Sequence, residues 1–86
     1  MEYLVLVDVQ LRDGIADPAG ATIERSLPAL GYRGISGVRV GKTVRFQIEA
    51  VDEKEALAVA EDLSVTFLAN PVIEDAVVTV RPVEGA

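Results

Sequence analysis

The sequence predicts a single α+β domain of the ferredoxin-like type, β-α-β-β-α-β, with a four-stranded antiparallel sheet and two helices on one of its faces. Apolar residues alternate with polar ones in several short segments, a pattern typical of strands with one buried face. Two further segments follow an aspartate, carry apolar residues at helical spacing and end in turn residues. A chain of 86 residues suits one core and not two, so we expect one domain over residues 1–86.

The first strand is predicted over Tyr3–Leu11, where every second residue is apolar. The other side of this strand begins with Leu4 and Leu6 and becomes polar from Asp8 onward. We therefore expect one side of the strand in the core and a smaller apolar patch on the opposite side.

The first helix is predicted to begin after Asp17, whose side chain can cap it, with Pro18 in the first turn, where its missing N–H costs nothing. Pro28 cannot donate a helical hydrogen bond, so we expect a kink or a short second segment there. Gly31 can adopt the left-handed conformation that ends many helices. The apolar residues at helical spacing are Ile23, Leu27 and Leu30.

Two strands, Ile35–Val40 and Lys42–Ala50, are predicted to form a hairpin that turns at Gly41. The second of them alternates apolar with polar residues along its whole length. Arg39 and Lys42 flank the turn, and such turns can present cations and amides to a phosphate. No helix follows as in a phosphate-binding loop, so a glycine required by a hairpin is the favoured interpretation.

The second helix is predicted to begin at the cap Asp52, with Glu55 in capping-box position, and to end at Asn70 and Pro71. A final strand follows over Glu74–Val83. The residues expected to face the core from this helix are Ala56, Ala60, Leu63 and Phe67. Right-handed connections then place the first and last strands side by side.

Helices on one side of the sheet would leave its other face bare. Leu4, Leu6 and Val77 would form an apolar patch on that face, with polar residues around it. A domain this small buries little surface alone, so the patch is expected to contact a partner. The simplest partner is a second copy in a homodimer, and a tetramer is the alternative.

Composition excludes several classes of function. The net charge of −6 opposes binding to nucleic acid, whose phosphates require a basic surface. No apolar stretch is long enough to cross a membrane, and the first residues do not resemble a signal peptide. We therefore expect a cytoplasmic protein that binds neither membranes nor nucleic acid.

The chain also lacks histidine and cysteine, which removes the common general base, the thiolate nucleophile and the usual transition-metal ligands. Paired carboxylates such as Glu61 and Asp62 fit solvated helix ends better than acid–base chemistry. We expect no catalytic residue, no metal site and no cofactor in this chain.

Four short motifs occur in a recognisable order: DPAG at 17–20, LGY at 30–32, VRVGK at 38–42 and LANPVIED at 68–75. With these motifs the chain resembles the PurS family, the small subunits of phosphoribosylformylglycinamidine synthase. The resemblance covers nearly the whole chain. It departs from the family pattern after LANPVIED, where an aromatic residue is common and Ala76 and Val77 stand here.

The resemblance implies a non-catalytic subunit that forms a dimer and bridges two catalytic subunits. A glutaminase subunit would release ammonia, and a large synthetase subunit, which would bind ATP and magnesium, would use it. The motif residues then become candidates for structural roles or partner contacts: Asp17, Arg39, Gly41, Lys42, Asn70 and Pro71.

Two other classes fit the predicted order of elements. A ligand-sensing module of the ACT type would bind amino acids near Asp13, Gly14 and Asp17. A small enzyme of the acylphosphatase type would need a phosphate-binding loop after the first strand, with Arg12 and Asn70 as the available polar residues. The segment RDGIADPAG does not resemble that loop.

Overall fold

The computed structural model describes residues 1–83, so 84–86 of the predicted domain lie outside the described residues. Its strands and α-helices are β1 (Glu2–Leu11), α1 (Pro18–Ser26), β2 (Lys42–Glu49), α2 (Glu53–Leu63) and β3 (Glu74–Pro82). A 3-10 helix, Pro28–Leu30, follows α1, as the proline predicts, and Gly31 ends it with a φ of 93°. A π-helical turn, Ser64–Leu68, follows α2.

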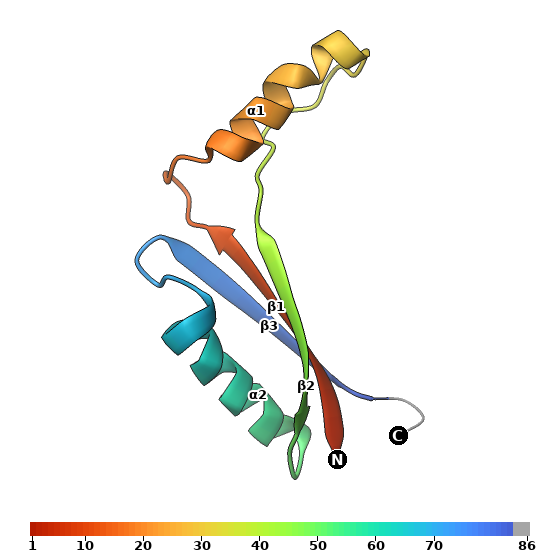
Figure 1. Ribbon diagram of the computed structural model, residues 1–86, viewed down its shortest axis with the longest axis vertical. Coiled ribbons are helices and arrows are strands. Elements are labelled where there is room, and N and C mark those ends of the chain that lie inside the picture. The colour runs from red at the N-terminus through yellow and green to blue at the C-terminus, as the bar shows by residue number, and fades with distance from the viewer. Residues whose placement is uncertain (84–86) are drawn as a thin grey trace.

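Within the described residues the sheet has three antiparallel strands in the order β2-β1-β3 (Figure 1). Val5 in the central strand lies opposite Phe46 of β2 and Val80 of β3. The prediction that the first and last strands are neighbours is confirmed. The prediction of a four-stranded sheet, and with it the ferredoxin-like β-α-β-β-α-β order, is wrong, because the order in the described residues is β-α-β-α-β.

The missing strand is the one predicted over Ile35–Val40. Two of its backbone N–H groups donate to side chains of α1 and its N-cap and not to a neighbouring strand: Val38 to Glu24 and Val40 to Asp17. Gly37, with a φ of 69°, also breaks the extended conformation. Because strand hydrogen bonds are replaced by helix side chains, this segment runs alongside α1 as a loop.

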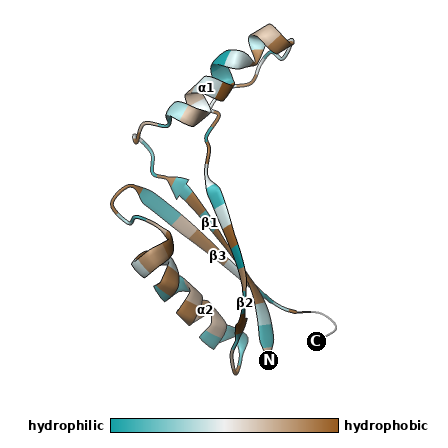
Figure 2. Ribbon diagram, in the orientation of Figure 1, coloured by the Kyte–Doolittle hydropathy of each residue, from teal (hydrophilic) through white to brown (hydrophobic). Residues whose placement is uncertain are grey.

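The core lies between the sheet and α2. Val5, Val7 and Val9 of β1 have at most 1% of their surface exposed. Ala56 and Ala60 of α2 are fully buried, and their small side chains let the helix approach the sheet closely. Figure 2 shows hydrophobic residues along the strands and α2, but also on α1, away from this core. Among the described residues, no helix is long and apolar enough to span a membrane.

Phe67 does not face the core as predicted, since 80% of its surface is exposed. The π-helical turn is the reason: the Ala69 N–H donates to the carbonyl of Ser64, five residues back, at 2.8 Å. The wider turn rotates the following residues out of α-helical register. Ser64 is buried instead, and Leu68 packs against the core.

Residues 12–41, which include α1 and its 3-10 helix, form an arm that projects from one end of the sheet (Figure 1). The prediction that both helices cover the sheet is therefore wrong, because within residues 1–83 the helix that packs closely on the strands is α2. The radius of gyration is 16.7 Å, against about 12 Å for a compact chain of this length. Large apolar residues of the arm are left exposed, namely Ile23, Leu30, Tyr32, Ile35 and Val40.

Candidate functional site

The base of the arm is held by the carboxylate of Asp17. Its Oδ1 accepts a hydrogen bond from the Gly20 N–H at 2.9 Å, which caps α1. Its Oδ2 accepts from the Val40 N–H at 2.8 Å, which joins the beginning of the arm to its end. The bonds from Gly20 and Val40, with a smaller contribution from the Arg39 charge, lower the pKa of Asp17. Both carboxylate oxygens therefore serve to hold the arm.

Two further side chains cross between the two sides of the arm. Arg39 donates from Nη2 to the carbonyl oxygens of Leu11 at 2.8 Å and Arg12 at 3.2 Å. The Glu24 carboxylate accepts from the Val38 N–H at 2.9 Å. Together with Asp17, these contacts connect α1, the end of β1 and the segment that leads into β2.

Two glycines allow the backbone to approach closely at the arm base. A Cβ atom on Gly20 would lie 2.5 Å from the carbonyl oxygen of Val38, and one on Gly41 would lie 2.6 Å from that of Val9. The prediction that Gly41 turns a hairpin is wrong, because the segment before it, Ile35–Val40, is not a strand. Glycine is required at position 41 because a side chain there would collide with β1. Lys42 follows, exposed, as the first residue of β2.

Asn70 and Pro71 lie in the turn between the π-helical turn and β3. Oδ1 of Asn70 accepts from the Val72 N–H at 3.0 Å, and Oε1 of Glu74 accepts from the Asn70 N–H at 2.7 Å. The Arg12 N–H donates to the Ile73 carbonyl at 2.8 Å, which ties this turn to the start of the arm. The DPAG, VRVGK and LANPVIED motifs therefore meet at one end of the sheet.

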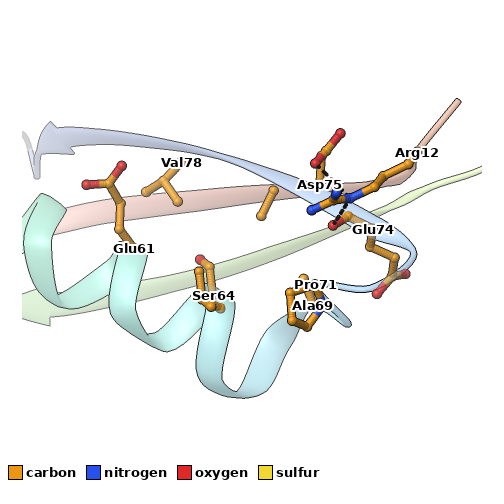
Figure 3. A pocket seen from close by; sticks show the side chains of 10 residues that line it. Arg12, Glu61, Ser64, Ala69, Pro71, Glu74, Asp75 and Val78 are labelled. Carbon is orange, nitrogen blue, oxygen red and sulfur yellow. Dashed lines mark hydrogen bonds and ion pairs between the residues drawn. The ribbon is translucent and has the colours of Figure 1, made fainter.

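A cleft of about 240 Å³ opens beside this turn (Figure 3). Arg12 lies at one side of it, where Nε is 3.3 Å from a carboxylate oxygen of Asp75, and both side chains are about half exposed or more. Ser64 is buried but donates to the Ala60 carbonyl at 2.7 Å. In residues 1–83 no group of three or more carboxylates could hold a metal ion. The cleft thus has paired polar groups and no recognisable catalytic arrangement.

The predicted oligomer face lies on the side of the sheet opposite α2, because Leu4, Leu6 and Val77 alternate with the core residues of their strands. Leu6 and Val77 are diagonal neighbours across β1 and β3. Val77 is 63% exposed, whereas Leu4 is only 7% exposed. The apolar patch on this face is therefore centred on Leu6 and Val77.

Gly20 and Glu24 belong to the arm base but were not among the predicted site residues. Gly20 could have been recognised from the sequence, because it is a glycine in the first turn of a predicted helix, where alanine would be more stable. Glu24 gives no comparable signal, because its partner Val38 is 14 residues away in a segment without regular structure. Asp17, Arg39 and Gly41 come together at the arm base, whereas Asn70 and Pro71 lie in the adjoining turn.

Comparison with known proteins gives a consistent result. The family model for PurS, phosphoribosylformylglycinamidine (FGAM) synthase, matches residues 4–82. The phosphoribosylformylglycinamidine synthase subunit PurS of Synechocystis is 38% identical over 84 residues, which are 98% of this chain and 84% of that protein. The same subunit of Methanocaldococcus jannaschii is 32% identical, over 95% of this chain and 99% of its own length.

Solved structures agree. The crystal structure of the PurS subunit from Thermotoga maritima has a TM-score of 0.87 and 30% identity, over 94% of this chain and 93% of that one. A chain in the structure of PurLQS from the same organism also has a TM-score of 0.87, at 30% identity, over 94% of this chain and 99% of that chain. The chain therefore belongs to the PurS family of phosphoribosylformylglycinamidine synthase subunits.

Proposed function

We propose that this chain is the assembly subunit of a phosphoribosylformylglycinamidine synthase in de novo purine biosynthesis. It bridges the glutaminase subunit and the synthetase subunit and supports the transfer of ammonia between them. Membership in the PurS family carries this proposal, and the similarity to a chain of the PurLQS structure supports it. ATP and magnesium would bind to the large synthetase subunit in the cytoplasm, and no cofactor to this chain.

The chemistry of the chain is consistent with such a role. Histidine and cysteine are absent from the sequence, and the best-placed carboxylate, Asp17, has both oxygens bound to backbone N–H groups. Arg39 likewise donates to backbone carbonyls. Side chains used in this way fix the position of the arm, and a fixed arm is suited to presenting a surface to other subunits.

The chain would act as a homodimer, with a tetramer as the larger assembly, and the face with Leu6 and Val77 would join two copies. A small apolar hollow of about 140 Å³ on that face is lined by Leu4, Leu6 and Thr79, with Val80 and Arg81. A second apolar face could fill it, and burial of apolar surface would add stability that an 86-residue chain lacks alone.

Reconstitution tests the proposed function. The purified synthetase and glutaminase subunits are assayed for amidine product with and without this chain, using either glutamine or ammonium chloride as the nitrogen source. We expect the chain to raise the glutamine-dependent rate strongly and the ammonium-dependent rate little, because it joins two active sites and contributes none. Equal glutamine-dependent rates with and without the chain would contradict the proposal.

Neither alternative class gains support from the structure. An amino-acid sensor of the ACT type would use Asp17, whose carboxylate is already occupied, and calorimetry with amino acids should show no binding. An acylphosphatase would use Arg12 and Asn70, but Arg12 pairs with Asp75 and Asn70 caps its own turn.

A further inference from the structure

The connection between α2 and β3 exposes three large apolar side chains within eight positions: Val65 at 62%, Phe67 at 80% and Val72 at 78%. We call these three residues the turn patch. The connection is compact, because Val65 and Pro71 line the same cleft. Figure 2 shows it largely in the hydrophobic colour. An apolar patch of this kind on a small domain marks a site of interaction.

The π-helical turn is what places Phe67 in the turn patch. Helix α2 buries Ala56 and Ala60, and an unbroken α-helical register would bring Phe67 to the same side. The extra residue in the turn moves it outward, and Ser64 and Leu68 take the inner positions. Such π-helical turns occur frequently at functional sites. The fold thus leaves a phenylalanine in water that contact with another protein could cover.

Acidic side chains surround the turn patch. Glu61 and Asp62 lie at the end of α2, and Glu74 and Asp75 lie at the beginning of β3. In the part of the chain that the structure describes, one ion pair involves these carboxylates, between Arg12 and Asp75. The last turn of α2 contains no basic residue. Apolar surface with unbalanced negative charge around it complements a protein segment that combines apolar residues with lysine or arginine.

The cleft beside the turn patch suits one cationic side chain. Its volume of about 240 Å³ is below the roughly 300 Å³ at which small-molecule pockets begin. The charged residues that line it are Arg12, Glu61, Glu74 and Asp75 (Figure 3). Glu74 already accepts from the Asn70 N–H, whereas Glu61 forms no hydrogen bond or ion pair within residues 1–83. The apolar part of the lining can pack against the methylene groups of a lysine or arginine.

A second copy of the chain does not suit this surface. Two turn patches that met about a twofold axis would bring their carboxylates together, and like charges across an interface repel. The whole chain carries a net charge of −6, so it has few cations to offer. A protein of different sequence can supply them.

We propose that the turn patch and its cleft bind a segment of a partner subunit that combines apolar residues with lysine or arginine, one of whose cationic side chains enters the cleft beside Glu61. The surface is separate from the sheet face of Leu6 and Val77 and from the apolar residues of the arm. The inference rests on the proposed function, because it assigns a surface through which the chain contacts another subunit of the synthase.

Binding to the purified synthetase and glutaminase subunits, added separately and together to the immobilised chain, tests the proposal. Phe67→Ser should weaken binding about tenfold or more, because the largest apolar contact is lost. Glu61→Lys should weaken binding and also reduce its dependence on salt concentration, because an attraction across the contact becomes a repulsion.

The controls separate contact from folding. Glu53→Lys makes the same change of charge at the other end of α2 and should bind as the unchanged chain does. Chemical denaturation should show little loss of stability in Phe67→Ser and Glu61→Lys, because both side chains are exposed and neither forms a hydrogen bond or ion pair within residues 1–83.

Photo-crosslinking identifies the bound segment. Phe67→p-benzoylphenylalanine places a photoreactive group in the turn patch, and the complex with the purified subunits is irradiated, digested and analysed by mass spectrometry. We expect a cross-link to a peptide of one partner subunit in which lysine and arginine outnumber the acidic residues. Val51→p-benzoylphenylalanine, at an exposed position before the start of α2, should not cross-link to that peptide.

Equal binding by Phe67→Ser, Glu61→Lys and the unchanged chain would overturn the inference and leave the proposed function standing. Cross-links from position 67 confined to a second copy of this chain, or to an acidic peptide of a subunit, would also overturn it. If the unchanged chain bound neither subunit, alone or together, the proposed function would fail, and this inference with it.

Discussion

Oδ2 of Asp17 lies 2.8 Å from the backbone nitrogen of Val40, 23 residues further along the chain, and this hydrogen bond closes the base of the arm. The same carboxylate caps α1 through Gly20. One side chain therefore fixes both where the helix begins and how the chain returns to the sheet.

Replacing Asp17 by Asn should loosen the arm, because one acceptor oxygen becomes a donor and cannot bind an N–H group. We expect faster amide hydrogen exchange at Gly20 and Val40, with unchanged exchange at Val5 and Val7 in the core. Asp13→Asn, an exposed residue in the same connection, is the matched control. Equal loosening by both variants would contradict the role of the Asp17 hydrogen bonds.

Acid should have the same effect as this substitution. The hydrogen bond from the Gly20 N–H, and after it the one from the Val40 N–H, lowers the folded-state pKa of Asp17 below its ordinary unfolded value. The stability that Asp17 contributes is therefore complete above the unfolded pKa and is lost as the pH falls through the folded pKa. NMR titration of the Val40 amide should report this loss, and Asp17→Asn should abolish the titration. A Val40 titration that persists in the variant would assign it to another group.

Gly20→Ala and Gly41→Ala should each destabilise the fold by about 1–3 kcal/mol, because a methyl group must displace a backbone carbonyl. Chemical denaturation measures the change in the free energy of unfolding. In Gly20→Ala two effects oppose each other, because alanine favours a helix while its methyl group would collide with the Val38 carbonyl. A variant that is more stable than the original chain would show that this contact does not require glycine.

Leu6→Lys should dissociate the sheet-face dimer, because the substitution would bury an unpaired charge between two copies. Gln47→Lys adds a charge to the same face at its polar edge and should have a much smaller effect. Sedimentation equilibrium measures the association, and circular dichroism confirms that each variant is folded. Unchanged association of Leu6→Lys would remove this face from the interface.

Asn70→Ala should cost about 1 kcal/mol in the isolated chain, because the Val72 N–H loses its side-chain acceptor. Pro71→Ala removes no hydrogen-bond partner and should leave the isolated chain nearly as stable. If Pro71 contacts a partner subunit, this second variant should still reduce glutamine-dependent activity in the reconstituted complex. Normal activity would limit Pro71 to a role in ending the helix.

The strands and helices of the core could be predicted because each has a local signal. Residues Tyr3 to Leu11 alternate as a strand with one buried face does, and Asp17 and Asp52 mark the helix starts that the structure confirms. The strand over Ile35–Val40 could not be excluded from the sequence, since its apolar residues also suit a strand. Its hydrogen bonds to Asp17 and Glu24 join positions 14 or more residues apart, which no local pattern reveals.

The site shows the same limit. The motifs identified Asp17, Arg39 and Gly41, and the structure brings these residues together at the arm base. The reason why position 41 requires glycine could not be predicted, because its contact with Val9 depends on the pairing of segments that are distant in sequence. The prediction that Phe67 faces the core is wrong because the π-helical turn adds one residue to a turn of the helix. The spacing of apolar residues in the sequence does not reveal that addition.

The extended arm also affects how the chain moves through water. Its dimensions of 51 × 32 × 15 Å give it more friction than a sphere of 9.2 kDa. A free monomer in this shape would elute early from a gel-filtration column and could be mistaken for a dimer of a compact protein.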